Sequence, residues 1–98
     1  FERYIAKSDP PVLVDFWAPW CAPCRAMAPV IDEVAGVMGG EVLCVKVNTE
    51  QEQKLAMDHG IKSIPTLVLF DAGRELTRLS GALEAEGLKR WLRGQLRI

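Results

Sequence analysis

Two cysteines three positions apart are the residues of this 98-residue sequence whose spacing suits redox chemistry. Cys21 and Cys24 follow an apolar, β-prone run at residues 12–17 and open a segment with helical periodicity. The free N–H groups and the dipole at a helix start stabilise a thiolate, which is the nucleophilic form of cysteine. Cys24 lies one turn further on, close enough to close a short disulfide with Cys21. Pro23 suits the first helical turn. The spacing predicts thiol–disulfide exchange with Cys21 as the attacking and Cys24 as the resolving thiol.

A CxxC pair can also be half of a zinc site. Zinc usually needs four ligands, however, which come from two such pairs or from histidines. Only Cys44 and His59 remain as further ligands of these types. Cys44 lies within an apolar run, so we expect an inert buried thiol there. We expect His59 to be a polar residue in a last helical turn. The sequence therefore predicts no metal site.

Asp15 interrupts the apolar run at residues 12–17. A carboxylate within a buried strand is expensive to ionise, so we expect a raised pKa. Asp15 would then accept and return the proton of Cys24, directly or through a water. The alternative is an aspartate at a strand edge or end that faces solvent. Lys46 would moderate the Asp15 charge if it points inward, and a solvent-facing Lys46 is the other possibility.

The composition is that of an ordinary globular domain, with 49% hydrophobic and 26% charged residues. We expect one domain over residues 1–98. The charges of 12 Lys+Arg and 13 Asp+Glu leave a net charge of −1, which predicts binding to neither nucleic acid nor an anionic membrane. No apolar run approaches the roughly 18 residues of a membrane span, and we expect no signal peptide. Three cysteines also exclude a fully paired disulfide framework.

The pattern of apolar residues predicts eight elements that position the cysteine pair. A strand–helix–strand unit followed by a hairpin indicates an α/β fold, with a mixed central β-sheet and helices on both faces. Pro29 should kink the helix after the cysteines, and Thr49 with Glu52 fits a capping box. The expected elements are a helix remnant at 1–7, a strand at 12–17, a helix ending before Gly39, a strand at 42–47, a helix at about 50–59, strands at 64–70 and 75–79, and a final helix with Leu88, Trp91, Leu92 and Leu96 on one face.

The runs VLVDFWAPWCAPC and GIKSIPTLVLF resemble the thioredoxin family, and the resemblance extends from Phe1 to the end of the chain. The wording VKVNTE is most similar to the second type of bacterial thioredoxin, without that type's N-terminal zinc-binding segment. The chain begins at Phe1 rather than at Met, which suggests trimming or processing. The resemblance implies a thioredoxin fold whose N-terminal strand is missing or truncated.

The same resemblance implies a role for each matching residue. Cys21 would be the surface nucleophile, Cys24 the buried resolving cysteine, and Asp15 the buried acid with Lys46 beside it. Pro65 would be a cis-proline that faces the pair, although proline bonds are mostly trans and the sequence pattern alone does not choose the cis form. The residues that match the family's substrate-docking surface are Trp20, Ala22, Pro23, Ile64, Pro65, Gly81 and Ala82, with Trp17 beside the active site.

Ala22 departs from the family's usual Gly-Pro dipeptide between the cysteines. Alanine removes the backbone freedom of glycine and adds a methyl group where a partner protein docks. Because Pro23 is retained, we expect the reducing character to survive. The size and sign of any change in redox potential stay open.

The resemblance implies a protein-disulfide reductase that needs no bound cofactor. Its partners would be protein disulfide substrates and thioredoxin reductase, an NADPH-dependent flavoprotein, and it would act as a cytoplasmic monomer. One alternative is an oxidant or disulfide isomerase of the same fold, but members of that kind generally carry His at the position of Pro23. A second alternative is a non-catalytic binding module, which would need neither the cysteine pair nor Asp15.

Overall fold

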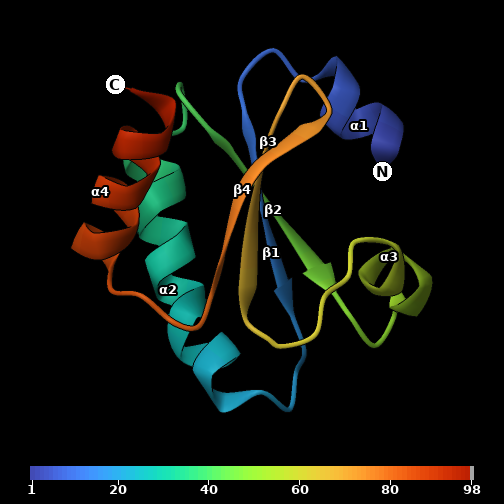
Figure 1. The fold of residues 1–98 in the computed structure, drawn as a ribbon. Helices are drawn as coiled ribbons and strands as arrows, with labels where there is room; N and C mark the ends of the chain where they lie inside the picture. Colours follow the sequence, from blue (N-terminus) through green and yellow to red (C-terminus); the bar gives the residue numbers. More distant parts are fainter. Residues whose placement is uncertain (98) are drawn as a thin grey trace.

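Helices and strands alternate along the chain in the order that the sequence predicts (Figure 1). The computed structural model describes residues 1–97. The elements are α1 (Glu2–Lys7), β1 (Val12–Trp17), α2 (Ala22–Val37), β2 (Leu43–Asn48), α3 (Gln53–Asp58), β3 (Thr66–Asp71), β4 (Arg74–Ser80) and α4 (Ala85–Leu96).

The strands form one mixed sheet with the order β2-β1-β3-β4. β1 pairs with β2 in parallel and with β3 antiparallel, and β3 pairs antiparallel with β4. The predicted mixed sheet is therefore confirmed. The pairing places β1, which leads directly into the cysteine pair, in the interior of the sheet. Along the described residues β1 is the first strand of the sheet, and the helix α1 precedes it.

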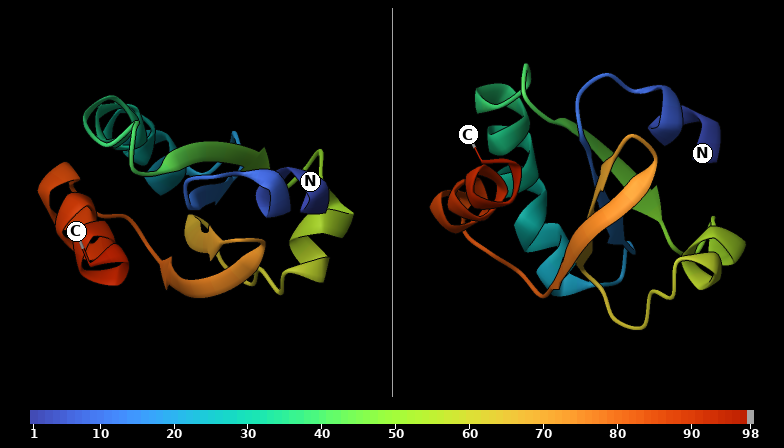
Figure 2. Two further views of the ribbon diagram at one scale, coloured as in Figure 1. Left: turned by 90° about the horizontal axis from the view of Figure 1, so that it is seen from above. Right: turned by 45° about the horizontal axis from the view of Figure 1, so that its top comes forward.

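The two faces of the sheet are covered by different helices. Successive side chains of a strand point to opposite faces. Val12, Val14 and Phe16 therefore pack with Ile5 of α1 and with part of α3, whereas Leu13 packs with α2 and α4. Seen from above in Figure 2, α2 and α4 lie on one side of the sheet and α1 and α3 on the other. The predicted helices on both faces are confirmed.

The helix that carries the cysteines is anchored by an apolar stripe. Met27, Ile31 and Val34 of α2 are buried against the sheet, and Met38, which caps the helix, is buried with them. Pro29 lies inside the helix and is exposed. This stripe holds the N-terminal end of α2 at the end of β1.

The capping box predicted for α3 is wrong. Glu52 occupies the N-cap position without a side-chain hydrogen bond to the helix. Thr49 instead extends the contact of β2 with β1, because its N–H and its Oγ1 both donate to the carbonyl oxygen of Trp17, at 2.8 and 3.1 Å. Thr49 therefore makes hydrogen bonds to a distant strand instead of capping the helix. The predicted glycine at the end of this helix is confirmed, since Gly60 has a φ of +63° just after His59.

Candidate functional site

Cys21 and Cys24 are joined by a disulfide at the start of α2. Cys21 is the N-cap residue of this helix, and its Sγ accepts a hydrogen bond from the backbone N–H of Cys24 at 3.2 Å. The pairing that the spacing predicts is confirmed. The side chains are 5% and 4% exposed, so the surface position that the resemblance implies for Cys21 is not seen in the oxidised pair. The cause is packing, because both cysteines form a buried cluster with Ala18, against which Trp17 and Ile64 pack.

The electrostatic surroundings of Cys21 favour a thiolate. A sulfur at the N-cap lies at the positive end of the helix dipole and can receive hydrogen bonds from free N–H groups. The first turn of α2 carries no acidic residue. Arg25 comes directly after Cys24. Its guanidinium donates to the carbonyl oxygen of Pro19 at 2.8 Å, which keeps the positive charge of Arg25 near the start of the helix.

The Ile64–Pro65 peptide bond is cis, as the resemblance implies. The carbonyl oxygen of Ile64 lies 3.8 Å from the Sγ of Cys21, across 43 residues of sequence. A sulfur in a disulfide carries no hydrogen, so this contact becomes a hydrogen bond only when Cys21 is a thiol. The structure thus places a backbone acceptor directly beside the sulfur that the sequence predicts to react.

Asp15 is buried on the α2 side of the sheet, with 3% of its surface exposed. It lines a pocket of about 160 Å³ that also contains Cys24, Ala28 and Lys46. Its Oδ1 has no hydrogen-bond partner in the described part of the chain. Burial raises the pKa of Asp15 to about 6, and the charge of Lys46 opposes the rise. The raised pKa that the sequence predicts is confirmed, and the solvent-facing alternative is wrong.

Lys46 pairs in register with Asp15 on the neighbouring strand, but its ion pair is elsewhere. Its Nζ lies 3.6 Å from Oδ1 of Asp32 on α2, and its side chain is 41% exposed. The sequence reasoning missed Asp32. The signal was present, because Cys24, Ala28 and Asp32 recur every four residues and so share one side of the helix.

The predicted docking residues differ in their exposure. Trp20 is 65% exposed, Ala22 and Pro23 are exposed, and Ile64 is half-buried. The N–H of Gly81 donates to the carbonyl oxygen of Pro65 at 2.9 Å, which ties the loop after β4 to the cis-proline. A hollow of about 210 Å³, which the sequence did not predict, lies between residues of α3 and the loop before β3; Trp20 and Ile64 line it.

Cys44 and His59 take positions that fit packing. Cys44 is half-buried beside the apolar cluster under α2, and burial raises the pKa of its thiol to about 11. This agrees with an inert thiol.

His59 lies among aromatic rings, with its ring centroid 5.5 Å from those of both Phe1 and Phe70, a contact that the sequence did not predict. Among the described residues no group of three or more His, Cys, Asp or Glu side chains could hold a metal ion.

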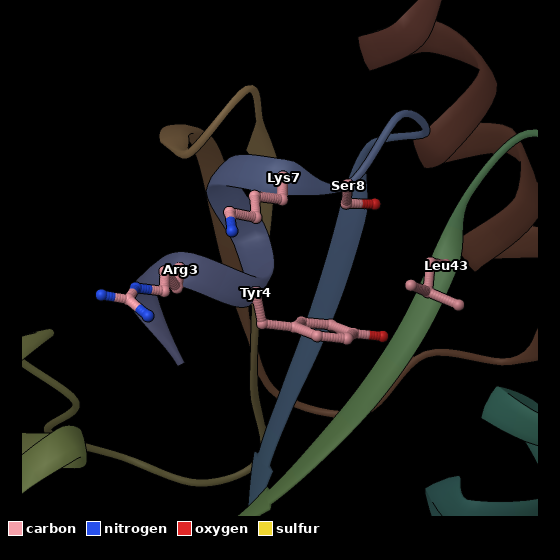
Figure 3. Close-up of a pocket in the computed structure, with 5 residues that line it drawn as sticks. All are labelled: Arg3, Tyr4, Lys7, Ser8 and Leu43. Atoms are coloured by element: carbon pink, nitrogen blue, oxygen red, sulfur yellow. The ribbon is translucent and has the colours of Figure 1, made fainter.

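A second hollow, of about 390 Å³, lies between α1 and the edge of the sheet (Figure 3). The side chain of Tyr4 reaches from α1 toward Leu43 of β2, and the other residues that line the hollow are Arg3, Lys7 and Ser8. None of the predicted site residues lies there. Size alone therefore does not locate the chemistry, which depends on the sulfur pair and the buried carboxyl.

None of the helices in residues 1–97 has the length and apolar character that a membrane crossing requires.

Comparison with known proteins gives the same family as the geometry. The family model described as thioredoxin matches residues 1–94. The chain is 46% identical to thioredoxin 1 of a Nostoc species over 96 residues, which cover 98% of this chain and 90% of that protein. It is 47% identical to thioredoxin of a Synechocystis species over 83 residues, or 85% of this chain and 78% of that protein. A thioredoxin M-type, chloroplastic, of Chlamydomonas reinhardtii is 47% identical over 83 residues, or 85% of this chain and 59% of that protein.

The Cys21–Cys24 pair lies at a helix start, the Ile64 carbonyl before the cis-proline lies beside its first sulfur, and the family model matches nearly the whole chain. The chain belongs to the thioredoxin family and is a thiol–disulfide oxidoreductase that reduces protein disulfides through Cys21 and Cys24.

Proposed function

We propose that Cys21 attacks the substrate disulfide and that Cys24 then releases the reduced substrate. The Cys21 thiolate forms a bond to one substrate sulfur while the substrate disulfide breaks and its other sulfur leaves as a thiolate. Cys24 next attacks the Cys21 sulfur, the mixed disulfide breaks, and the Cys21–Cys24 disulfide forms. The substrate gains two electrons and the cysteine pair loses them. The observation that carries this assignment is the N-cap position of Cys21, whose sulfur receives the N–H of Cys24.

We propose that Asp15 carries the proton of the second step. Cys24 must lose its proton before it can attack, and the departing substrate thiolate needs a proton. Asp15 shares a pocket with Cys24, and its pKa of about 6 lets it bind and release a proton near neutral pH. Lys46, at the same pocket, limits how far this pKa rises.

We propose that an extended substrate segment lies beside the backbone of Ile64 and Pro65. This is a short case of strand addition, in which main-chain hydrogen bonds supply affinity with little demand on sequence. The exposed ring of Trp20 and the hollow that it lines with Ile64 would receive an apolar substrate side chain. The remaining contacts would come from Ala22, Pro23, Gly81 and Ala82.

Members of the thioredoxin family need no bound cofactor, so the oxidised pair must be reduced by a partner. We propose an NADPH-dependent flavoprotein, thioredoxin reductase, as that partner. We propose that the chain works as a monomeric single domain in the cytoplasm, since a reductase requires a compartment that keeps thiols reduced. A coupled NADPH assay, light scattering and cell fractionation test these three points separately.

Trapping the mixed disulfide tests the roles of the two cysteines. Reduced Cys24→Ser protein, incubated with insulin, should accumulate an adduct that mass spectrometry locates at Cys21. Cys21→Ser protein, which keeps Cys24, is the matched control and should accumulate far less. Cys24→Ser/Cys44→Ala protein should trap as well as Cys24→Ser. An adduct located at Cys44, or equal trapping by the Cys21→Ser control, would overturn the assignment.

A further inference from the structure

Asp32 forms an ion pair with Lys46, a residue that lines the pocket of Asp15. Lys46 lines this pocket, and its ammonium lies 3.6 Å from Oδ1 of Asp32. Asp32 is on α2, two helical turns beyond Cys24, and its side chain is 74% exposed. The Lys46 ammonium thus pairs with an exposed carboxyl group, while the Lys46 side chain lines the pocket of a buried one.

One oxygen of the buried Asp15 carboxyl, Oδ1, has no hydrogen-bond partner among residues 1–97, although Lys46 is the register partner of Asp15 on β2. The titratable or charged groups that face Asp15 are Lys46 and Cys44 from β2 and Cys24 and Arg25 from α2. Cys24 is in the disulfide, and Arg25 donates to the carbonyl oxygen of Pro19. Lys46 is accordingly the cation whose position decides how strongly the Asp15 charge is compensated.

We propose that Asp32 is a positioning residue that holds the Lys46 ammonium at the surface and away from the Asp15 carboxyl. An ammonium that enters the pocket must lose water, which costs free energy that only an ionised Asp15 returns. An exposed ion pair contributes little to stability. Here it supplies an anion for Lys46 that requires no desolvation, and so it favours the outer position.

The consequence is an Asp15 carboxyl that still binds a proton close to neutral pH. Without the Asp32 carboxylate the ammonium would turn toward Asp15, and an opposite charge within about 4–6 Å favours the ionised form of a carboxyl group. Asp15 would then lose its proton at lower pH. This inference rests on the proposed role of Asp15 as the proton carrier for Cys24, and it identifies the group outside the pocket that adjusts that role.

The direct experiment is a carboxyl-carbon NMR titration of Asp15 in the oxidised protein, in which Cys21 and Cys24 do not titrate. Asp32→Asn should weaken proton binding by Asp15 by up to about fivefold, because Asp32 acts through Lys46 and can contribute no more than an exposed ion pair is worth. Lys46→Met should strengthen it. Asp58→Asn is the matched control, because Asp58 also forms an exposed pair with a lysine, Lys54, on α3; it removes the same charge and should leave the Asp15 titration unchanged.

A double variant separates positioning from a direct field effect. In the Lys46→Met background, Asp32→Asn should have no further effect on the Asp15 titration, because Asp32 acts through Lys46. An effect of equal size in that background would overturn the proposal, and so would an unchanged or strengthened proton affinity in Asp32→Asn alone. If the titration shifts as expected but the pH profile of mixed-disulfide release does not follow, Asp32 positions Lys46 and it is the proton-carrier role of Asp15 that fails.

Discussion

The two faces of the sheet share the same strands but differ in what they bury. On the α1 and α3 face, Val14, Phe16 and Val68 pack in an apolar cluster. On the α2 and α4 face a similar cluster gives way, at the end of β1, to Asp15 and the cysteine pair. Figure 2 shows the sheet between the two helix layers. Adjacent residues of one strand thus serve stability on one side and chemistry on the other, because side chains alternate along the strand.

The largest expected effect removes the chemistry and leaves the packing. Cys21→Ser should abolish insulin reduction in a coupled assay, since a hydroxyl is a far weaker nucleophile than a thiolate. A serine hydroxyl can still accept the N–H of Cys24, so urea unfolding of the reduced proteins should give nearly the same free energy. A few per cent of the wild-type rate is about the detection limit of the assay. A higher residual rate would assign the attack on the substrate disulfide to another residue.

On the α1 and α3 face, a substitution should lower stability and leave the chemistry unchanged. Phe16→Ala should lower the free energy of unfolding by about 3–5 kcal/mol, because it leaves a cavity in the α1 and α3 cluster. The folded Phe16→Ala protein should reduce insulin at the wild-type rate when the assay conditions lie well outside its unfolding transition. Leu69→Ala, on the α2 and α4 face, is the paired variant and should cost about 2–5 kcal/mol. A large loss of specific activity in folded Phe16→Ala protein would show that the two faces are coupled.

Asp15 sharpens the comparison through the pH dependence of stability. Its pKa is about 6 in the folded protein against 3.8 for the unperturbed group, so between these pH values the unfolded chain loses its proton first and stability falls as pH rises. The fall amounts to about 3 kcal/mol and is complete above the folded pKa. Relative to wild type, Asp15→Asn should therefore gain about 3 kcal/mol between pH 3 and pH 8, as measured by urea unfolding. A stability difference that does not change with pH would contradict the buried, unpaired carboxyl.

The smallest effect is expected at Cys44, which lies on the same face as Asp15. Cys44→Ala should change the free energy of unfolding by less than about 1.5 kcal/mol, because the half-buried thiol packs as a small apolar group. Insulin reduction should be unchanged, since the raised pKa of Cys44 keeps it protonated. A slower reaction would mean that the reactive region of this face extends along β2.

The features predicted correctly from the sequence are those that depend on neighbours along the chain. The stripe of Met27, Ile31 and Val34 predicted α2, and the position of Cys21 before it predicted a sulfur at the start of that helix. The apolar run around Asp15 predicted its burial. These features depend on helical or strand periodicity, which neighbouring residues are enough to reveal.

The errors and omissions share one cause, which is a partner distant in sequence. Thr49 fits a capping box locally, yet the carbonyl oxygen of Trp17 on the adjacent strand takes its hydroxyl. For Lys46 both an inward and a solvent-facing position were open; it lines the Asp15 pocket, and the sequence did not reveal its ion pair with Asp32 on α2. His59 was expected as a polar residue in a helical turn, and it packs among aromatic rings that include Phe16 of β1.

The sequence alone determined which groups could react: two thiols one helical turn apart at a helix start, and a carboxyl in an apolar strand. The tertiary structure decided what each group meets. It set the Ile64 carbonyl beside the Cys21 sulfur, left Oδ1 of Asp15 without a hydrogen-bond partner in the described part of the chain, and paired Lys46 with an exposed carboxylate. Periodicity determines the direction of a side chain within its own element. The group opposite depends on strand register and helix packing, which are set only when distant segments close on one another.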